Sequence, residues 1–131
     1  MKQSLSKIAL LVRDYDEALR FYLDKLQFEL MEDTPMDATK RWVVIKPKGA
    51  SNEACLLLAK AKNEAQLQFV GNQTGGRVFL FLYTDDLERD YQHLLKESIT
   101  IVRFPSIEPY GKVLVFADLY GNLWDLIEPS T

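Results

Sequence analysis

Residues 7–24, KIALLVRDYDEALRFYLD, and residues 77–94, RVFLFLYTDDLERDYQHL, repeat one pattern that decides the fold of this chain. Each stretch begins with an apolar segment typical of a strand, continues with a short acidic turn and ends in an amphipathic helix. Asp14 and Glu17 have the spacing of a helix-capping box, and apolar residues then recur with the helical period up to Leu26. The pattern predicts one helix over 15–26 and a second over about 86–97, each packed on a sheet.

Strand-like segments surround both helices, and they occur in the same order in each half of the chain. The first half has them at 7–12, 28–32, 41–45 and 54–59, and the second half at 77–83, 100–104, 112–117 and 123–127. The offset between the halves drifts from 70 to 68, as an old duplication would leave it. We therefore predict an α+β fold of two βαβββ modules in a single domain over 1–131: module one at 1–60, a crossover at 61–76 and module two at 77–131.

The composition limits the classes of partner. A chain of 131 residues, 47% of them hydrophobic, can form one core of useful size. Its net charge of −3, without a run of lysines or arginines, argues against binding to nucleic acids or anionic membranes. The apolar runs are too short to span a bilayer, the first residues are polar, and Cys55 is the only cysteine. A reducing compartment, and hence a cytoplasmic location, is expected.

Several segments resemble a known family. They are VRDYDEALRFY at 12–22, followed by LQFEL, then DLYGN at 118–122 and the ending LWDLIEP. Together with the paired modules, they resemble the vicinal oxygen chelate superfamily, which includes glyoxalase I, bleomycin-resistance proteins and extradiol dioxygenases. The resemblance implies sheets that curl around a central cavity, and often a homodimer in which two chains build one cavity.

The resemblance also points to the positions where metal-dependent members of that superfamily carry His and Glu ligands. In this chain the positions are occupied by Lys7, Leu57, Arg77 and Asp125, of which only Asp125 can bind a metal. Independently of the family, zinc and similar ions usually take three or more protein ligands, mostly imidazole or thiolate, and the chain has one histidine. That residue, His93, is expected at the edge of the second helix or facing solvent. We therefore expect no metal and no cofactor.

If Lys7 faces the cavity that the resemblance implies, alternation along the strands makes Arg77 and Asp125 face it too, and the pocket is then largely apolar and aromatic. A charge buried alone is costly, so we expect Asp125 to pair with Lys7 or with Arg77. Such a pair could serve stability alone, or one cation could remain to bind an anionic group of a ligand. The predicted ligand-binding residues are Lys7, Arg77, Asp125, Phe79, Trp42 and Tyr110.

Three functions are compatible with this pattern. The leading interpretation is a metal-independent protein that binds a small molecule, with the polar groups of the cavity suited to an anionic ligand. The first alternative is a lyase, isomerase or dioxygenase that uses a non-standard metal site, or Lys7 as an acid or base with a pKa lowered by burial. The second is a resistance protein that sequesters a drug, although Lys7 and Arg77 argue against a cationic drug. The sequence leaves enzymatic activity open.

Overall fold

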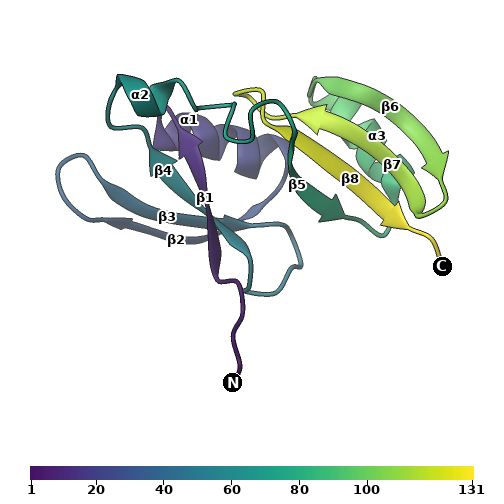
Figure 1. The fold of residues 1–131 in the computed structure, drawn as a ribbon, viewed down its shortest axis with the longest axis horizontal. Coiled ribbons are helices and arrows are strands. Elements are labelled where there is room, and N and C mark those ends of the chain that lie inside the picture. Colours follow the sequence, from purple (N-terminus) through teal and green to yellow (C-terminus); the bar gives the residue numbers. More distant parts are fainter. The chain divides into compact units, whose positions relative to one another are not determined.

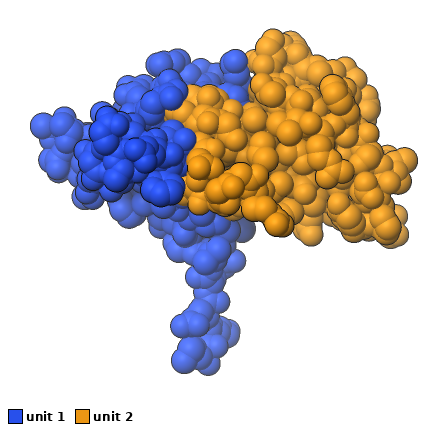
Figure 2. Space-filling model, turned by 45° about the horizontal axis from the view of Figure 1, so that its top comes forward, with its two compact units in different colours: residues 1–70 blue, residues 71–131 orange.

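The computed structural model describes residues 1–131, which divide into two compact units, Met1–Val70 and Gly71–Thr131. Figure 2 shows these units in blue and orange. The boundary falls within 61–76, the segment predicted to connect the modules. Each unit contains one four-stranded sheet accompanied by helices (Figure 1). None of the helices has the length and apolar character needed to cross a membrane.

The first unit has the strand order β1-β4-β3-β2. Its strands are β1 (Lys7–Val12), β2 (Glu29–Pro35), β3 (Arg41–Lys46) and β4 (Cys55–Lys60). Its helices are α1 (Tyr15–Leu19), the π-helical continuation η1 (Arg20–Lys25) and the short α2 (Glu64–Leu67). Strand β1 runs parallel to β4, and the other pairs are antiparallel. The connection from β1 to its parallel partner passes through the helix and two strands, as the predicted βαβββ order requires.

Helix α1 begins where the capping box predicts. Asp14 has an extended backbone, and its Oδ2 accepts a hydrogen bond of 2.9 Å from the amide of Glu17. The single helix predicted over 15–26 instead changes from α-helical to π-helical hydrogen bonding at Arg20. It ends before Gln27, whose φ of +63° lies in the left-handed region that cannot continue a right-handed helix. The helix therefore has the predicted extent but not uniform geometry.

The register of the first sheet confirms the predicted alternation of its faces. Lys7 lies beside Cys55, and Ala9 beside Leu57, which in turn pairs with Val44. On the opposite face, Leu10 and Val12 are completely buried. The face covered by the helix is thus apolar, and the face that carries Lys7 is the one available for a site.

The second unit repeats the same arrangement, with the strand order β5-β8-β7-β6. Its strands are β5 (Val78–Tyr83), β6 (Ile101–Glu108), β7 (Gly111–Ala117) and β8 (Leu123–Pro129), and its helix is α3 (Leu87–Lys96). Asp86 caps α3 by accepting a 3.0 Å hydrogen bond from the amide of Arg89. The predicted fold of two βαβββ modules is confirmed.

The segment DLYGN between β7 and β8 forms a buried turn. One carboxylate oxygen of Asp118 accepts hydrogen bonds from the amides of Tyr120 and Asn122, both at 2.9 Å. Its other oxygen accepts from the Asn122 side chain at 2.8 Å. Gly121 supplies the φ of +98° that the turn needs. The role of Asp118 is therefore that of a turn residue, as such a sequence predicts.

Candidate functional site

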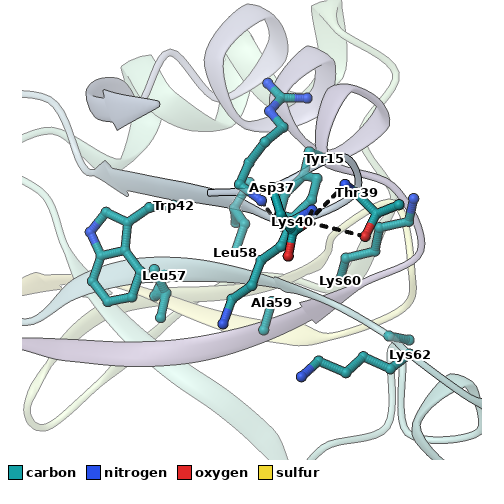
Figure 3. A pocket seen from close by; sticks show the side chains of 12 residues that line it. Tyr15, Asp37, Thr39, Lys40, Trp42, Leu57, Leu58, Ala59, Lys60 and Lys62 are labelled. Carbon is teal, nitrogen blue, oxygen red and sulfur yellow. Dashed lines mark hydrogen bonds between the residues drawn. The ribbon is translucent and has the colours of Figure 1, made fainter. Parts of the chain in front are cut away.

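The first unit contains a cavity of about 540 Å³ beside strands β3 and β4 (Figure 3). Its apolar and aromatic lining consists of Tyr15, Trp42, Leu57, Leu58, Ala59 and Ala61. Its polar lining consists of Asp37, Thr39, Lys40, Arg41, Lys60 and Lys62. The volume is typical of cavities that bind a small molecule, and an apolar lining with a few polar groups is their usual composition.

Trp42, one of the predicted ligand-binding residues, forms one wall of this cavity. It is half-buried, unlike the core residue Trp124, which is 2% exposed. The ammonium of Lys7 lies 5.9 Å from the centre of the Trp42 ring, within reach of a cation–π interaction. Two of the six predicted ligand-binding residues, Lys7 and Trp42, therefore come together in this unit, with the indole ring accessible from the cavity.

Arg41 supports the opposite wall through Tyr15. Its backbone amide donates to the Tyr15 hydroxyl at 3.2 Å, and its guanidinium lies 5.2 Å from the centre of the Tyr15 ring. The guanidinium also donates to both oxygens of Asp33, at 3.1 and 2.7 Å, and to Asp16 at 2.9 Å. These hydrogen bonds lower the pKa of Asp33 and raise that of Arg41. Arg41 is thus neutralised and positions the aromatic wall.

A tight turn between β2 and β3 brings Lys40 to the cavity. The Oδ1 atom of Asp37 accepts hydrogen bonds from the amides of Thr39 and Lys40, at 2.9 and 2.8 Å. These hydrogen bonds, above all the one from Thr39, lower the pKa of the Asp37 carboxyl. The nearby charge of Lys40 lowers it only slightly further. The amide of Met36 donates to the carbonyl of Lys40 at 2.8 Å and closes the hairpin. The carboxylate of Asp37 therefore stabilises the turn, which fixes the backbone of Lys40.

Lys62 reaches the same cavity from the segment that follows β4. Its amide donates to Oε1 of Gln66 at 2.8 Å, and the amide of Gln66 donates to the Asn63 side chain at 2.9 Å. This reciprocal arrangement starts helix α2 and holds the backbone of Lys62 at the cavity rim. Sequence reasoning missed Lys40, Lys60 and Lys62, because a hairpin turn and a crossover show no periodic signal that brings them together.

In the second unit, Asp125 lies on the sheet face opposite the helix. The register aligns it with Phe81 on β5 and Val115 on β7, and Val115 with Arg103 on β6. Its Oδ1 atom is buried and has no hydrogen-bond partner. Burial raises the pKa of the Asp125 carboxyl, and the charge of Arg103 opposes this rise. The carboxylate is therefore poorly compensated where it lies.

The predicted ion pair between Asp125 and Arg77 is wrong. The salt bridges of this unit are Arg89 with Asp85 and Asp90, and Lys112 with Glu128. Arg77 precedes β5, which begins at Val78, and is exposed. The cation that acts on Asp125 is instead Arg103, because both side chains belong to one row across the sheet. Lys7 belongs to the other unit, and its pairing with Asp125 stays a prediction.

The remaining predicted residues of the second unit lie apart from one another. Phe79 is half-buried at an irregularity in the pairing of β5 with β8. Tyr110 is 56% exposed in the turn between β6 and β7, where its carbonyl accepts from the amide of Ser130. The aromatic residue beside Asp125 is Phe81, which is 66% exposed. Strand alternation places Phe79 and Phe81 on one face, and only the register irregularity between Val78 and Leu80 separates them.

The donor groups do not fit the metal site that the fold suggests. The four positions hold Lys7, Leu57, Arg77 and Asp125, which supply one carboxylate and no imidazole or thiolate. No group of three or more His, Cys, Asp or Glu side chains comes together that could hold a metal ion. His93 lies half-buried in α3. The chemistry available at the cavity is that of a ring-stacking surface with ammonium groups, which suits binding and orientation of a ligand.

The sequence profile of the Glyoxalase/Bleomycin resistance protein/Dioxygenase superfamily matches residues 4–126. This chain therefore belongs to that superfamily, as its resemblance to the vicinal oxygen chelate proteins predicted. An uncharacterized protein of Shewanella frigidimarina (strain NCIMB 400) is 57% identical over 129 residues, which cover 98% of this chain and 95% of the relative.

Solved structures show the same fold. The crystal structure of UcmS2 matches with a TM-score of 0.84 at 28% identity, covering 98% of this chain and 99% of that protein. The structure of TnmS3, an antibiotic binding protein from Streptomyces sp. CB03234, matches with a TM-score of 0.77 at 27% identity, covering 98% of each chain. The fold of this chain is thus shared with an antibiotic binding protein.

Proposed function

We propose that this chain binds a small aromatic molecule without a metal ion, in the cavity beside Trp42. The observation that carries the proposal is the combination of cavity volume and lining. The cavity of about 540 Å³ is lined by the rings of Trp42 and Tyr15 and by the apolar side chains of Leu57 and Ala59, among others. Aromatic walls favour a flat ligand, because stacked rings gain energy beyond the burial of their area.

The donor groups support the metal-independent part of the proposal. Borderline metals require several imidazole, thiolate or carboxylate ligands at one point, and the positions inherited in this fold provide only Asp125. A lone carboxylate of raised pKa is a weak ligand, since it must lose its proton before it can bind. Binding of an organic ligand therefore depends on the side chains of the protein alone.

A second candidate is sequestration of an antibiotic. It is favoured by the likeness to TnmS3, an antibiotic binding protein, over 98% of this chain. The two candidates share one site and differ in the ligand, since a sequestering protein would bind a toxic aromatic compound and protect the cell. Growth assays with and without expression of the chain, over a panel of aromatic antibiotics, distinguish them.

We also propose that the chain forms a homodimer in the cytoplasm. Strand β6 lies at the edge of its sheet and exposes Phe104 and Ile107, which are 69% and 84% accessible. Exposed apolar groups on an unpaired edge favour pairing with another chain. The buried thiol of Cys55 suits a reducing compartment. Sedimentation equilibrium measures the assembly, and a single species of monomer mass up to 100 μM would contradict it.

The function is tested by metal analysis and by titration with a neutral aromatic probe. The purified chain is analysed for bound metal and titrated calorimetrically with Ni²⁺, Zn²⁺, Mn²⁺ and Fe²⁺. It is then titrated with naphthalene-2-carboxamide. We expect the purified chain to contain no stoichiometric metal and to bind the amide saturably at one site per chain. One metal per chain, or no binding of the amide to the metal-free protein at 1 mM, would contradict it.

A further inference from the structure

The cavity beside Trp42 concentrates positive charge in an acidic protein. The chain carries a net charge of −3, yet the cavity lining contains four cations, Lys40, Arg41, Lys60 and Lys62, and one carboxylate, Asp37. Charges of one sign that gather at a cavity raise the local concentration of ligands of the opposite sign. The charged side chains that line the cavity are therefore mostly cations, unlike those of the chain as a whole.

Two of these charged groups are already engaged. Arg41 forms salt bridges of 2.9 Å with Asp16 and 2.7 Å with Asp33, so its charge is balanced. The Asp37 carboxylate accepts the amides of Thr39 and Lys40 within its own turn. Neither group is available to a ligand without loss of an existing contact. What remains at the cavity is the positive charge of the lysines.

The three lysines differ in where they lie. Lys60 pairs with Val12 in the sheet register, and alternation places both on the helix-covered face, away from Ala59. Figure 3 shows the side chains of Lys40 and Lys62 extending into the space beside Ala59. Neither ammonium takes part in a salt bridge of the structure. Two cations that form no salt bridge thus reach one part of the cavity from two different segments of the chain.

The backbones that carry these two lysines are held by hydrogen bonds. The turn closed by Asp37 fixes Lys40, and the side chain of Gln66 fixes the amide of Lys62. A ligand that binds between them therefore pays for ordering two side chains but not two loops, which favours binding. Trp42 lines the same cavity and offers a surface for a ring.

We propose that Lys40 and Lys62 form an anion subsite in the cavity beside Trp42, so that the ligand is an aromatic acid. The ring packs against Trp42, and an ionised group such as a carboxylate lies between the two ammonium groups. This inference rests on the proposed function and adds to it the charge of the ligand. It also explains why an acidic chain keeps two lysines unpaired at a cavity.

The test compares two probes of nearly equal shape, naphthalene-2-carboxylate and naphthalene-2-carboxamide. Both are titrated calorimetrically into the full chain and into the variant Lys40→Gln/Lys62→Gln. A matched control, Lys48→Gln/Lys96→Gln, removes two exposed lysines that do not line the cavity. We expect the carboxylate to bind about fivefold more tightly than the amide, the gain of two partly exposed ion pairs. The cavity variant should lose this preference, and the control should keep it.

The salt dependence of binding provides an independent test. In the unmodified chain, raising NaCl from 20 to 500 mM should weaken binding of the carboxylate and leave binding of the amide unchanged. In the cavity variant, the same change should affect the binding of neither probe. Equal binding of both probes, or a preference that survives Lys40→Gln/Lys62→Gln, would overturn the anion subsite while the proposed function stands. Failure of the amide to bind at 1 mM would overturn the proposed function itself, and the subsite that rests on it.

Discussion

The two modules have the same strand order and the same capped helix, yet the open faces of their sheets are chemically opposite. The first module presents Trp42 with unpaired lysines around a cavity. The second presents the exposed ring of Phe81 beside Asp125, a carboxylate without a hydrogen-bond partner on its buried oxygen. The faces under the helices are alike, because both must bury apolar side chains to form a core. Core packing therefore constrains the faces under the helices and leaves the open faces free to differ.

The largest effect is expected where the two modules are alike. Leu58 on β4 and Leu126 on β8 are corresponding core residues, 1% and 2% exposed. Substitution of either by Ala should reduce the free energy of unfolding by about 3 kcal/mol, through lost burial and an unfilled cavity. Chemical denaturation measures the loss. The control Leu57→Ala, on the half-exposed open face of β4, should cost less than half as much. Equal losses for Leu57 and Leu58 would mean that the faces are not distinct.

The next effect should separate the open faces. Trp42→Ala removes the ring that lines the cavity and should weaken binding of naphthalene-2-carboxamide about tenfold, the size of a good aromatic contact with its buried area. Phe81→Ala, the matched change on the second module, should alter the affinity less than twofold. Isothermal titration calorimetry measures both. A larger loss of affinity with Phe81→Ala would indicate that the binding site lies in the second module.

A smaller effect on the free energy of unfolding is expected at the capped N-termini of the helices. Asp14 caps α1 and Asp86 caps α3, each by accepting a backbone amide at about 3 Å. Substitution of Asp86 by Ala should cost about 1 kcal/mol of unfolding free energy, as loss of a helix cap does. Asp86→Asn, which retains the capping oxygen, is the control and should be nearly neutral. A cost for Asn equal to that for Ala would show that charge, and not the cap, matters at this position.

The smallest effect concerns Asp125, where substitution should stabilise the protein rather than destabilise it. Because burial raises its pKa, the folded chain keeps this proton at a pH where the unfolded chain has released it. The stability that this carboxyl contributes is complete below its unfolded pKa, about 3.9, and is lost as the pH rises through the higher folded pKa. Asp125→Asn should therefore raise the melting temperature by about 2 °C at pH 7 and leave it unchanged near pH 3.5.

Thermal unfolding followed by circular dichroism at both pH values measures the effect of Asp125→Asn. A control at an exposed carboxylate, Glu53→Gln, should change neither melting temperature. A lower melting temperature for Asp125→Asn at pH 7 would indicate that Asp125 forms a favourable ion pair after all. The comparison thus tests directly whether the sequence-based expectation of a pair or the observed lack of a partner describes this residue.

The boundaries of the fold were predictable because they depend on local patterns. The first strand, the capped start of α1 and the turn at Asp118 follow from residues a few positions apart, and each was placed to within a residue or two. The π-helical geometry of η1 was not predictable, since an apolar stripe shows the face of a helix and not its hydrogen-bond pattern. Arg77 was misplaced as a partner of Asp125 because β5 begins only at Val78 and its pairing with β8 is irregular between Val78 and Leu80, where simple alternation fails.

The sequence by itself determined the class of this protein: two βαβββ modules, the apolar faces that close them, and a set of inherited positions that lacks the donors for a metal. Only the tertiary structure decided where the cavity lies. Tyr15, Lys40 and Lys62 lie on different elements, and no periodicity connects them. Their convergence follows from the path of a hairpin turn and a crossover, which packing and hydrogen bonds in the folded chain alone determine.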